Sequence, residues 1–401
     1  MKPAYNIWDL RAQAKRRLPK AIFEFIERGS EDDILIEHNQ DALRRIKLNP
    51  RTLCDVSARD TAIELFGKRR ETPLIIGPTG TADLLCHKGE SAIASAAGRA
   101  GVPFTLATSS TTSMDVIKEV ATAGLWMQMY LWERRDLSWQ VVERAAALGA
   151  EALVLTVDTP MWPNREFNKH NGMANPIRPN LRLARSFLAR PGWMLRVLGR
   201  YMLAGGLPKF ANYPAEIGGK VSGPVNRVTN SASVCWDDVK ELKRRWPGKL
   251  LLKGILNRED AIMAADHGVD GIVVSNHGGR TFDASPASIE VLAEIVDAVG
   301  SRLAVIFDSG IRRGSDVVKA LAIGADAVMI GRATLYGAAA GGSEGAARAL
   351  AILKDEISTA MAMVGVTSLD RLDRSYLRTE TVPGLGATRS KSASQAEPRS
   401  P

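Results

Sequence analysis

Three stretches of the chain repeat one pattern, and this repetition limits the folds that the chain can adopt. Residues 148–158, 267–277 and 323–332 each contain the end of a helix, a Gly, an acidic residue, an apolar strand and a polar tip. Apolar strands that alternate with amphipathic helices predict a parallel sheet covered by helices. With weaker copies included, the candidate strands lie near residues 73–77, 102–108, 125–132, 152–158, 250–255, 271–276, 304–308 and 327–331.

Eight such units favour a closed barrel over an open sheet. The competitor is a doubly wound sheet, but no Gly-x-Gly-x-x-Gly motif follows the first strand, and roughly 290 residues suit eight βα units. We therefore expect a (β/α)₈ TIM barrel. One of its helices is predicted over 285–300, with Ser285 as the cap, Pro286 in the first turn and Gly300 as the stop.

Segments of different character flank and interrupt the barrel. Residues 18–29 begin near a Pro and end at a Gly, as a helix does, and indicate a helical cap before the barrel. About 90 residues separate the fourth and fifth strands, far more than a βα unit needs, so we expect a long insertion after strand 4. The expected segments are an N-terminal helical cap over 1–72, the barrel over 73–364, the insertion over 167–235, a C-terminal extension over 365–380 and a disordered tail over 381–401.

The insertion carries almost all of the excess positive charge of the chain. The net charge is +9, yet no acidic residue occurs between Glu166 and Glu216, where eight Lys and Arg residues occur. A uniformly basic protein would suggest nucleic acid, whereas one basic and apolar segment indicates a local partner surface, so we expect no nucleic-acid partner. Residues 193–203 alternate apolar clusters with Arg at helical spacing, and we expect 178–210 to contact an anionic membrane peripherally. A lid or a subunit contact is the alternative.

The composition excludes several other classes of protein. Hydrophobic residues make up 45% and charged residues 24% of the chain, as in ordinary globular proteins. Cys54, Cys86 and Cys235 are far apart and form no C-x-x-C pair, so we expect neither a disulfide framework nor a zinc or other metal site. No secretory signal and no apolar run long enough to span a bilayer occur. We expect a cytoplasmic protein, or one that lies peripherally on the inner face of the cell membrane.

The sixth candidate strand ends in a loop whose residues suit chemistry. His277 can exchange a proton near neutral pH, and Arg280 can hold a carboxylate or a phosphate through two hydrogen bonds. The alternative is a capped turn with a solvated His. Because the strand tips of a barrel meet at one face, this loop is expected to share one cavity with the other tips. Those tips are Thr79, Gln128, Tyr130, Asp158, Lys253, Asp308, Gly310 and Arg332.

Two further strand tips favour a phosphate and a redox cofactor. Residues 308–314 and 331–332 combine Gly with Arg after the seventh and eighth strands, where this fold commonly binds phosphate. Lys253, at the tip of an apolar strand, is costly to bury unless it compensates a negative charge, such as one on a reduced cofactor. A salt bridge at the barrel rim is the alternative for Lys253.

These motifs resemble those of a known family, the FMN-dependent 2-hydroxy-acid dehydrogenases and oxidases, which includes (S)-mandelate dehydrogenases and flavin-linked L-lactate dehydrogenases. The resemblance covers roughly residues 5–380 and centres on 275–280, Ser-Asn-His-Gly-Gly-Arg. It implies FMN as the cofactor, oxidation of an (S)-2-hydroxy acid to the 2-oxo acid, electron transfer to a quinone or another carrier, and a homotetramer. Supporting matches are residues 77–80, 128–130, 156–160, 164–166, 253–254, 308–314 and 331–332.

The resemblance also implies a role for each site residue. His277 would be the general base, Asp158 would orient it, and Lys253 would stabilise the anionic reduced flavin, with Tyr130 as a further catalytic residue. The substrate would be bound by Arg165, Arg280, Tyr130 and Phe25. FMN would be held by Pro78, Thr79, Gly80, Gln128, Thr156, Lys253, Ser275, Asp308, Ser309, Gly310, Ile311, Arg312, Gly331 and Arg332.

A few positions depart from the usual family pattern. Phe25 stands where the family usually has a Tyr, so the substrate carboxylate would rely more on the two arginines. Ala107 stands where a flavin-binding Ser is usual, and Thr108 or the backbone would substitute. Gly80, in place of the more frequent Ala, and the insertion are most similar to membrane-associated mandelate dehydrogenases and bacterial lactate dehydrogenases. Phe25 and Trp162 would suit an apolar or aromatic substrate.

Two alternatives to the dehydrogenase remain open. An oxidase of the same family would pass electrons to oxygen and produce hydrogen peroxide. A degenerate barrel would bind flavin, or a partner through its basic insertion, without turnover.

Overall fold

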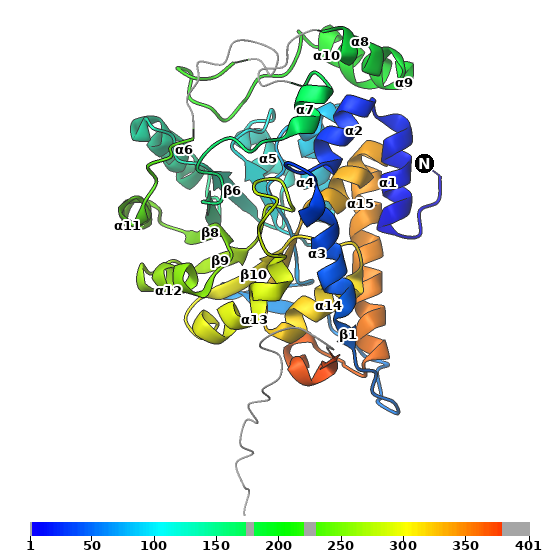
Figure 1. Ribbon diagram of the computed structural model, residues 1–401, viewed down its shortest axis with the longest axis vertical. Helices are drawn as coiled ribbons and strands as arrows, with labels where there is room; N and C mark the ends of the chain where they lie inside the picture. Colours follow the sequence, from blue (N-terminus) through cyan, green and yellow to red (C-terminus); the bar gives the residue numbers. More distant parts are fainter. Residues whose placement is uncertain (1, 174–179, 220–229, 379–401) are drawn as a thin grey trace, which may run out of the picture.

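A closed barrel of eight parallel strands forms the centre of the computed structural model, which describes residues 2–173, 180–219 and 230–378 (Figure 1). Each barrel strand pairs with the next along the chain, and the last pairs with the first. The predicted (β/α)₈ barrel and all eight candidate strands are confirmed. The strands are β4 (Leu74–Ile76), β5 (Phe104–Ala107), β6 (Leu125–Met129), β7 (Ala152–Thr156), β8 (Lys249–Ile255), β9 (Gly271–Val274), β10 (Ala304–Asp308) and β11 (Ala327–Ile330).

A helical layer surrounds the strands, with a barrel helix after each of them (Figure 1). The last helix consists of two pieces, because the backbone leaves the helical conformation at Gly341 and Gly342. The barrel helices are α4 (Gly89–Arg99), α5 (Met114–Val120), α6 (Arg135–Ala147), α11 (Trp236–Arg245), α12 (Arg258–Asp266), α13 (Ser288–Val299), α14 (Gly314–Ile323) and α15 (Arg332–Met363).

The barrel interior is packed with apolar side chains toward the end where the strands begin. Trp126, Val154, Leu251 and other inward-facing residues form this core with Leu65. Leu65 belongs to a hairpin of β2 (Ile63–Leu65) and β3 (Lys68–Arg70), which closes this end of the barrel. Chemistry is therefore confined to the opposite end, where the strands finish and the loops are polar.

The acidic residue of each sequence repeat ties neighbouring elements together at the closed end. The carboxylate of Asp270 accepts a hydrogen bond from the Leu250 N–H at 3.0 Å, and that of Asp326 accepts one from the Val305 N–H at 2.7 Å. Glu151 instead pairs with Arg70 of the hairpin at 2.6 Å. The acidic residue of each repeat therefore stabilises the fold, and only the polar residues at the strand tip are placed to take part in chemistry.

Helix α13 begins later than predicted, so Ser285 as its cap is wrong. The helix starts at Ser288, and the Glu290 carboxylate accepts from the Ala287 N–H at 3.1 Å at its first turn. The residues before it serve another purpose, because the Pro286 carbonyl accepts from the side-chain amide of Asn276 at 3.0 Å. The turn before α13 therefore holds the loop that follows β9.

Three N-terminal helices lie against the barrel, α1 (Ile7–Arg17), α2 (Lys20–Glu27) and α3 (Ile34–Arg45). Asp283 accepts from the backbone N–H groups of Ile34 and Leu35 at 3.1 and 2.9 Å, and Asn39 exchanges side-chain hydrogen bonds with Asn276. These contacts fasten α3 to the loop after β9. In the segment 1–72, these three helices lie within 7–45, and the remainder includes the hairpin and the short strand β1 (Lys47–Leu48), which pairs with β12 (Leu377–Arg378).

The described part of the insertion forms a group of short helices at one end of the molecule, beside α1 and α2 (Figure 1). The helix predicted over 193–203 is continuous but includes a π-helical stretch, Met194–Gly199. The π-helical stretch joins α9 (Pro191–Trp193) to α10 (Arg200–Leu203), and the other helices of the segment are α7 (Glu166–His170) and α8 (Leu181–Leu188). Residues 178–179 of the expected membrane segment, 379–380 of the expected C-terminal extension and the expected tail over 381–401 lie outside the described residues. No described helix is both long and apolar enough to cross a bilayer.

Candidate active site

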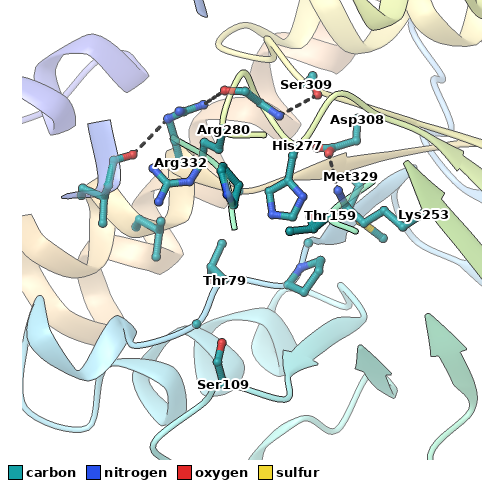
Figure 2. A pocket seen from close by; sticks show the side chains of 18 of the residues that line it. Thr79, Ser109, Thr159, Lys253, His277, Arg280, Asp308, Ser309, Met329 and Arg332 are labelled. Carbon is teal, nitrogen blue, oxygen red and sulfur yellow. Dashed lines mark hydrogen bonds and ion pairs between the residues drawn. The ribbon is translucent and has the colours of Figure 1, made fainter. Parts of the chain in front are cut away.

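A cavity at the carboxyl ends of the strands collects most of the residues predicted from sequence (Figure 2). His277, Arg280 and Arg332 face Thr79 and Ser109 across this space. Gln128, Thr156 and Ser275 do not line the cavity, and all three are buried. The predicted residues in its wall are Phe25, Pro78, Thr79, Gly80, Tyr130, Trp162, Arg165, Lys253, His277, Arg280, Asp308, Ser309, Gly310, Ile311, Arg312, Gly331 and Arg332.

His277 and Asp158 form a close pair at the tips of β9 and β7. The imidazole Nδ1 lies 3.0 and 3.2 Å from the two carboxylate oxygens of Asp158. Burial lowers the pKa of His277, and although Asp158 raises it, the nearby Lys253 and Arg165 lower it again, so the pKa lies below its ordinary value. Burial raises the pKa of Asp158, but the attraction of His277 and Lys253 outweighs this effect and leaves it lowered. The pair is therefore a neutral imidazole beside an ionised carboxylate near pH 7.

The backbone of the loop after β9 adopts a conformation that few sequences tolerate. His277, Gly278 and Gly279 have φ values of 58°, 66° and 75°, all in the left-handed region. Such a conformation is costly for a residue with a Cβ and is found mainly where the surrounding structure enforces it, often at active sites. A Cβ on Gly278 would also lie 2.7 Å from Nη1 of Arg332. The Gly-Gly pair thus allows both the turn and the close approach of Arg332.

Lys253 does not form a rim salt bridge. Its side chain is only 4% exposed, and its Nζ lies 2.8 Å from the Ser275 hydroxyl and 3.2 Å from the Asp308 carboxylate. Ser275 in turn donates to Asp308 at 2.5 Å. The three side chains form one hydrogen-bonded group within the barrel mouth, with the ammonium partly neutralised by Asp308.

Three arginines in the cavity wall are held by backbone carbonyls. Arg280 donates to the carbonyls of Phe25 and Arg28 at 2.8 and 2.7 Å, and Arg165 donates to the carbonyl of Arg280 at 3.1 Å. Arg332 donates to the carbonyls of Ile26 and Gly278 at 3.0 and 2.8 Å. Within the described ranges, no carboxylate pairs with any of the three within 4.0 Å. Carbonyls fix the direction of a guanidinium without neutralising its charge, so the cluster suits an anion.

Burial and the repulsion between neighbouring positive charges lower the pKa values of Arg165, Arg280 and Arg332. Burial lowers the pKa of Arg280 well below its ordinary value, and the adjacent Arg165 and Arg332 lower it further. Burial likewise lowers the pKa of Arg165 and Arg332. A bound anion would relieve this unfavourable electrostatic energy, which favours the cluster as a binding site.

The residues after β10 and β11 fit a phosphate-bearing cofactor such as FMN. Nε of Arg312 and Nη2 of Arg332 are buried and have no hydrogen-bond partner among the described residues. Buried guanidinium groups rarely leave a donor unused, so these two atoms indicate a missing acceptor. Ser309 and Gly310 both have positive φ values, and a Cβ on Gly310 would lie 2.8 Å from Leu43. The donors and the tight backbone turn form a cradle for a phosphate.

One expectation about an individual side chain needs correction, and another gains detail. Thr108 does not replace a hydroxyl at Ala107, because the Thr108 hydroxyl is buried and donates to the backbone carbonyl of Gln128 at 2.5 Å. Phe25, which was expected to lack the usual hydroxyl, lines the cavity, and the guanidinium carbon of Arg280 lies 5.6 Å from its ring centroid. The contact between Phe25 and Arg280 is therefore a cation–π contact.

Several cavity residues were not predicted as site residues. Ser109 follows a strand whose tip carries no motif, and Tyr213 and Asn230 come from the insertion. Thr159 and Met329 lie within the matched stretch 156–160 and the repeat 323–332, but no role was expected for either side chain. Burial, followed by the negative charge of Asp158, raises the pKa of Tyr130, so its phenol remains protonated. The lack of acidic residues in the insertion predicted a partner surface, but it gave no indication that Tyr213 lines the cavity.

Together the fold and the site define a class of protein: a (β/α)₈ barrel whose cavity suits a phosphate-bearing cofactor and an anion beside the His277–Asp158 pair. Residues 14–379 match the model of a family described as FMN-dependent dehydrogenase. The chain therefore belongs to the FMN-dependent dehydrogenase family and is an FMN-dependent oxidoreductase that acts on CH–OH donors.

Several relatives are similar in sequence to this protein over nearly the whole chain. An (S)-mandelate dehydrogenase of Pseudomonas putida is 37% identical over 380 residues, covering 94% of this chain and 95% of that protein. A peroxisomal (S)-2-hydroxyacid oxidase of Arabidopsis thaliana is 38% identical, covering 94% and 96%. An L-lactate dehydrogenase of a Caulobacter species is 38% identical, covering 92% and 97%.

Solved structures agree with the sequence relatives. The crystal structure of a monotopic membrane protein, (S)-mandelate dehydrogenase, superposes with a TM-score of 0.87 at 36% identity, covering 94% of this chain and all of that one. A mandelate oxidase variant solved with (S)-mandelic acid superposes with a TM-score of 0.79 at 33% identity, covering 94% and 98%.

Proposed function

We propose that the enzyme oxidises an (S)-2-hydroxy acid, preferably one with an aromatic side chain, to the 2-oxo acid and passes the electrons to a quinone or another carrier. The observation that carries this proposal is the arginine cluster, which pairs with no carboxylate of the described residues, beside the neutral imidazole of His277 and its partner Asp158. A carboxylate bound by the cluster would place the adjacent hydroxyl-bearing carbon near the imidazole. The names of the relatives support the 2-hydroxy acid as substrate.

In this proposal the chain's own residues position the substrate and move its proton. Arg165 and Arg280 bind the carboxylate, which fixes C2 relative to His277. Because Nδ1 of His277 faces Asp158, that nitrogen carries the ring proton, and Nε2 accepts the proton from the substrate. Asp158 then stabilises the imidazolium through the same contact. FMN, when bound, supplies the acceptor for the electron pair.

The cofactor-binding roles are also proposals. Arg312, Arg332 and the backbone of 309–311 would hold the phosphate, because unsatisfied donors lie there. Asp308 is acidic and suits the ribityl hydroxyls better than the phosphate. Lys253, hydrogen-bonded to Ser275, would stabilise negative charge on the flavin ring, and Gln128 and Thr156, which share a 3.0 Å hydrogen bond, would support the ring from within the barrel.

The substrate proposal is tested by anaerobic reduction of the FMN-loaded enzyme. We expect (S)-mandelate to bleach the flavin absorbance faster than (S)-lactate, because Phe25, Trp162 and Tyr213 surround the cavity with aromatic rings. Glycolate, which has no side chain, serves as the reference. If no 2-hydroxy acid bleaches the flavin, the chain is a flavin-binding barrel without this activity.

The electron acceptor is tested by reoxidation of the substrate-reduced enzyme. We expect a soluble quinone analogue to restore the flavin absorbance much faster than air-saturated buffer does. One relative is an (S)-2-hydroxyacid oxidase, so faster reoxidation by air would indicate oxygen as the acceptor. Rapid reoxidation by air with stoichiometric hydrogen peroxide would make this enzyme an oxidase.

We also propose that the insertion docks on an anionic membrane surface. Leu181, Leu188, Leu195 and Leu203 are 84%, 68%, 75% and 92% exposed, in a segment that has no acidic residue. Exposed arginines lie among them, namely Arg182, Arg185, Arg196 and Arg200. Apolar side chains that enter the acyl boundary and arginines that contact anionic headgroups are typical of interfacial helices. The related mandelate dehydrogenase is described as monotopic.

Membrane docking is tested by co-sedimentation with vesicles that contain phosphatidylglycerol. We expect the wild-type enzyme to sediment and a Leu188→Gln/Leu195→Gln/Leu203→Gln variant to remain in the supernatant. Met263→Gln/Met363→Gln is the matched control, because both side chains are exposed and apolar but lie outside the insertion. Equal sedimentation of the Leu variant and the control would reject the docking surface.

A homotetramer, attached in this way to the inner face of the cell membrane, completes the proposal. The support for the tetramer is the family resemblance alone. Light scattering of the detergent-free Leu variant measures its mass, and a monomer would contradict the tetramer.

A further inference from the structure

Tyr213 belongs to the insertion, yet it lines the same cavity as His277 and Arg280. Of the described residues of 167–235, only Tyr213 and Asn230 contribute to the cavity wall. The segment with the exposed leucines therefore also supplies part of the active-site wall. This second role is independent of any membrane.

The backbone around Tyr213 is fastened to the loop after β5. The Ala211 N–H donates to the Ser110 carbonyl at 3.1 Å. The Asn212 side chain accepts from the Met114 N–H at 2.8 Å and donates to the Thr112 carbonyl at 3.0 Å, and Asn212 is only 2% exposed. Because the two residues that precede Tyr213 are held to the loop after β5, its position does not depend on the outer helices of the insertion.

The ring of Tyr213 is fixed by aromatic contacts on two sides. Phe210 stacks on it with 5.0 Å between centroids and 17° between planes. Trp132, which is 2% exposed, meets it edge-on at 5.2 Å and 72°. Contacts of this kind hold a ring in one orientation, so Tyr213 presents a rigid face to the cavity. Tyr213 also lies close enough to Tyr130 to affect its electrostatic environment.

We infer that Tyr213 determines substrate specificity by forming the wall against which the side chain on C2 of an aromatic 2-hydroxy acid packs. This inference rests on the proposed function, because it takes the carboxylate of the substrate to lie at Arg165 and Arg280. A phenyl group would reach the ring of Tyr213, whereas the methyl group of lactate is too short to gain from it. Burial raises the pKa of Tyr213 to about 12, so the wall carries no charge at working pH.

The test compares (S)-mandelate with (S)-lactate in the FMN-loaded enzyme. We expect Tyr213→Leu to lower kcat/KM for mandelate roughly fivefold to tenfold, mainly through KM, and to change kcat/KM for lactate less than twofold. Tyr213→Phe keeps the ring and is expected to keep the preference for mandelate. Phe210→Leu removes the ring that stacks on Tyr213 but leaves the residues of the cavity wall unchanged, so we expect it to weaken the preference for mandelate less than Tyr213→Leu does.

The outcomes separate this inference from the proposed function. If wild-type flavin is not bleached by either acid, the proposed function fails, and the inference fails with it. If the wild-type enzyme turns over and Tyr213→Leu loses activity toward both acids in the same ratio, Tyr213 is only structural and the inference is overturned. Should Tyr213→Leu lose FMN, Tyr213→Met, whose side chain is longer and unbranched, is measured instead with the same expected result.

Discussion

Nδ1 of His277 lies 3.0 Å from Oδ1 of Asp158, although 119 positions separate the two residues in the chain. They meet because β7 and β9 end at the same face of the barrel, with only β8 between them. The pairing keeps the imidazole oriented and allows it to become positively charged during proton transfer.

The pH dependence of kcat/KM reports the state of His277 in the free enzyme. His277 must be neutral to accept a proton, and its pKa is lowered by burial, so we expect activity to fall only as the pH decreases through a value below 6.5. Asp158 raises that pKa, so Asp158→Asn is expected to move the acidic limb to lower pH while it also reduces the maximal rate. An acidic limb that moves to higher pH in Asp158→Asn would contradict this assignment.

Arg280→Met removes one of the guanidinium groups expected to bind the substrate carboxylate. A hydrogen bond to a charged group contributes about 1.5–3 kcal/mol, so we expect kcat/KM for a 2-hydroxy acid to fall roughly 10- to 100-fold. Substrate titration of the holoenzyme measures the effect. Arg182→Met, which removes an exposed arginine of the insertion, is the control and should leave kcat/KM unchanged. Equal losses in the two variants would show that net charge matters and the specific contact does not.

Arg332→Met tests the cofactor cradle. Nη2 of Arg332 is buried without a partner, so its loss should weaken FMN binding, by roughly 10-fold or more, rather than the fold. FMN retained after gel filtration and the fluorescence of released flavin measure the change. Undiminished FMN retention in both Arg332→Met and Arg312→Met would rule out this cradle.

Gly278→Ala separates backbone strain from a specific clash. Gly278 and Gly268 have similar φ values of 66° and 68°, but a Cβ on Gly278 meets Arg332 whereas one on Gly268 meets nothing within 4 Å. We expect both Ala variants to lose about 1 kcal/mol of folding stability through the strained backbone. Only Gly278→Ala should also lose FMN affinity. Similar FMN binding in the two variants would contradict the role of the Gly278–Arg332 contact.

The barrel and the strand tips could be predicted because they depend on local periodicity. Apolar runs that end in Gly and polar residues locate β7, β9 and β11, and the geometry of a parallel barrel then brings their tips together. The start of α13 could not be predicted, because Pro286 uses its carbonyl to hold Asn276, a contact across a loop. The helix propensities of residues 285–288 do not predict a hydrogen bond to Asn276.

Other features of the site depend on tertiary contacts that sequence patterns do not encode. Lys253 was correctly placed in the barrel mouth, but its partner Asp308 was expected at the phosphate, and only the structure brings the two within 3.2 Å. Tyr213 was missed because nothing in its local sequence marks it. Its place in the wall follows from the hydrogen bonds of Asn212 to the loop after β5.

The central claim is that His277 removes a proton from a 2-hydroxy acid bound by Arg165 and Arg280. The most direct measurement is the rate of anaerobic flavin bleaching by (S)-mandelate in FMN-loaded wild-type and His277→Ala enzymes, with FMN content matched between them. We predict that wild-type flavin is bleached and that His277→Ala slows bleaching roughly 10²- to 10⁴-fold, as expected for loss of a general base. Bleaching at the wild-type rate in a fully FMN-loaded His277→Ala enzyme would contradict the claim.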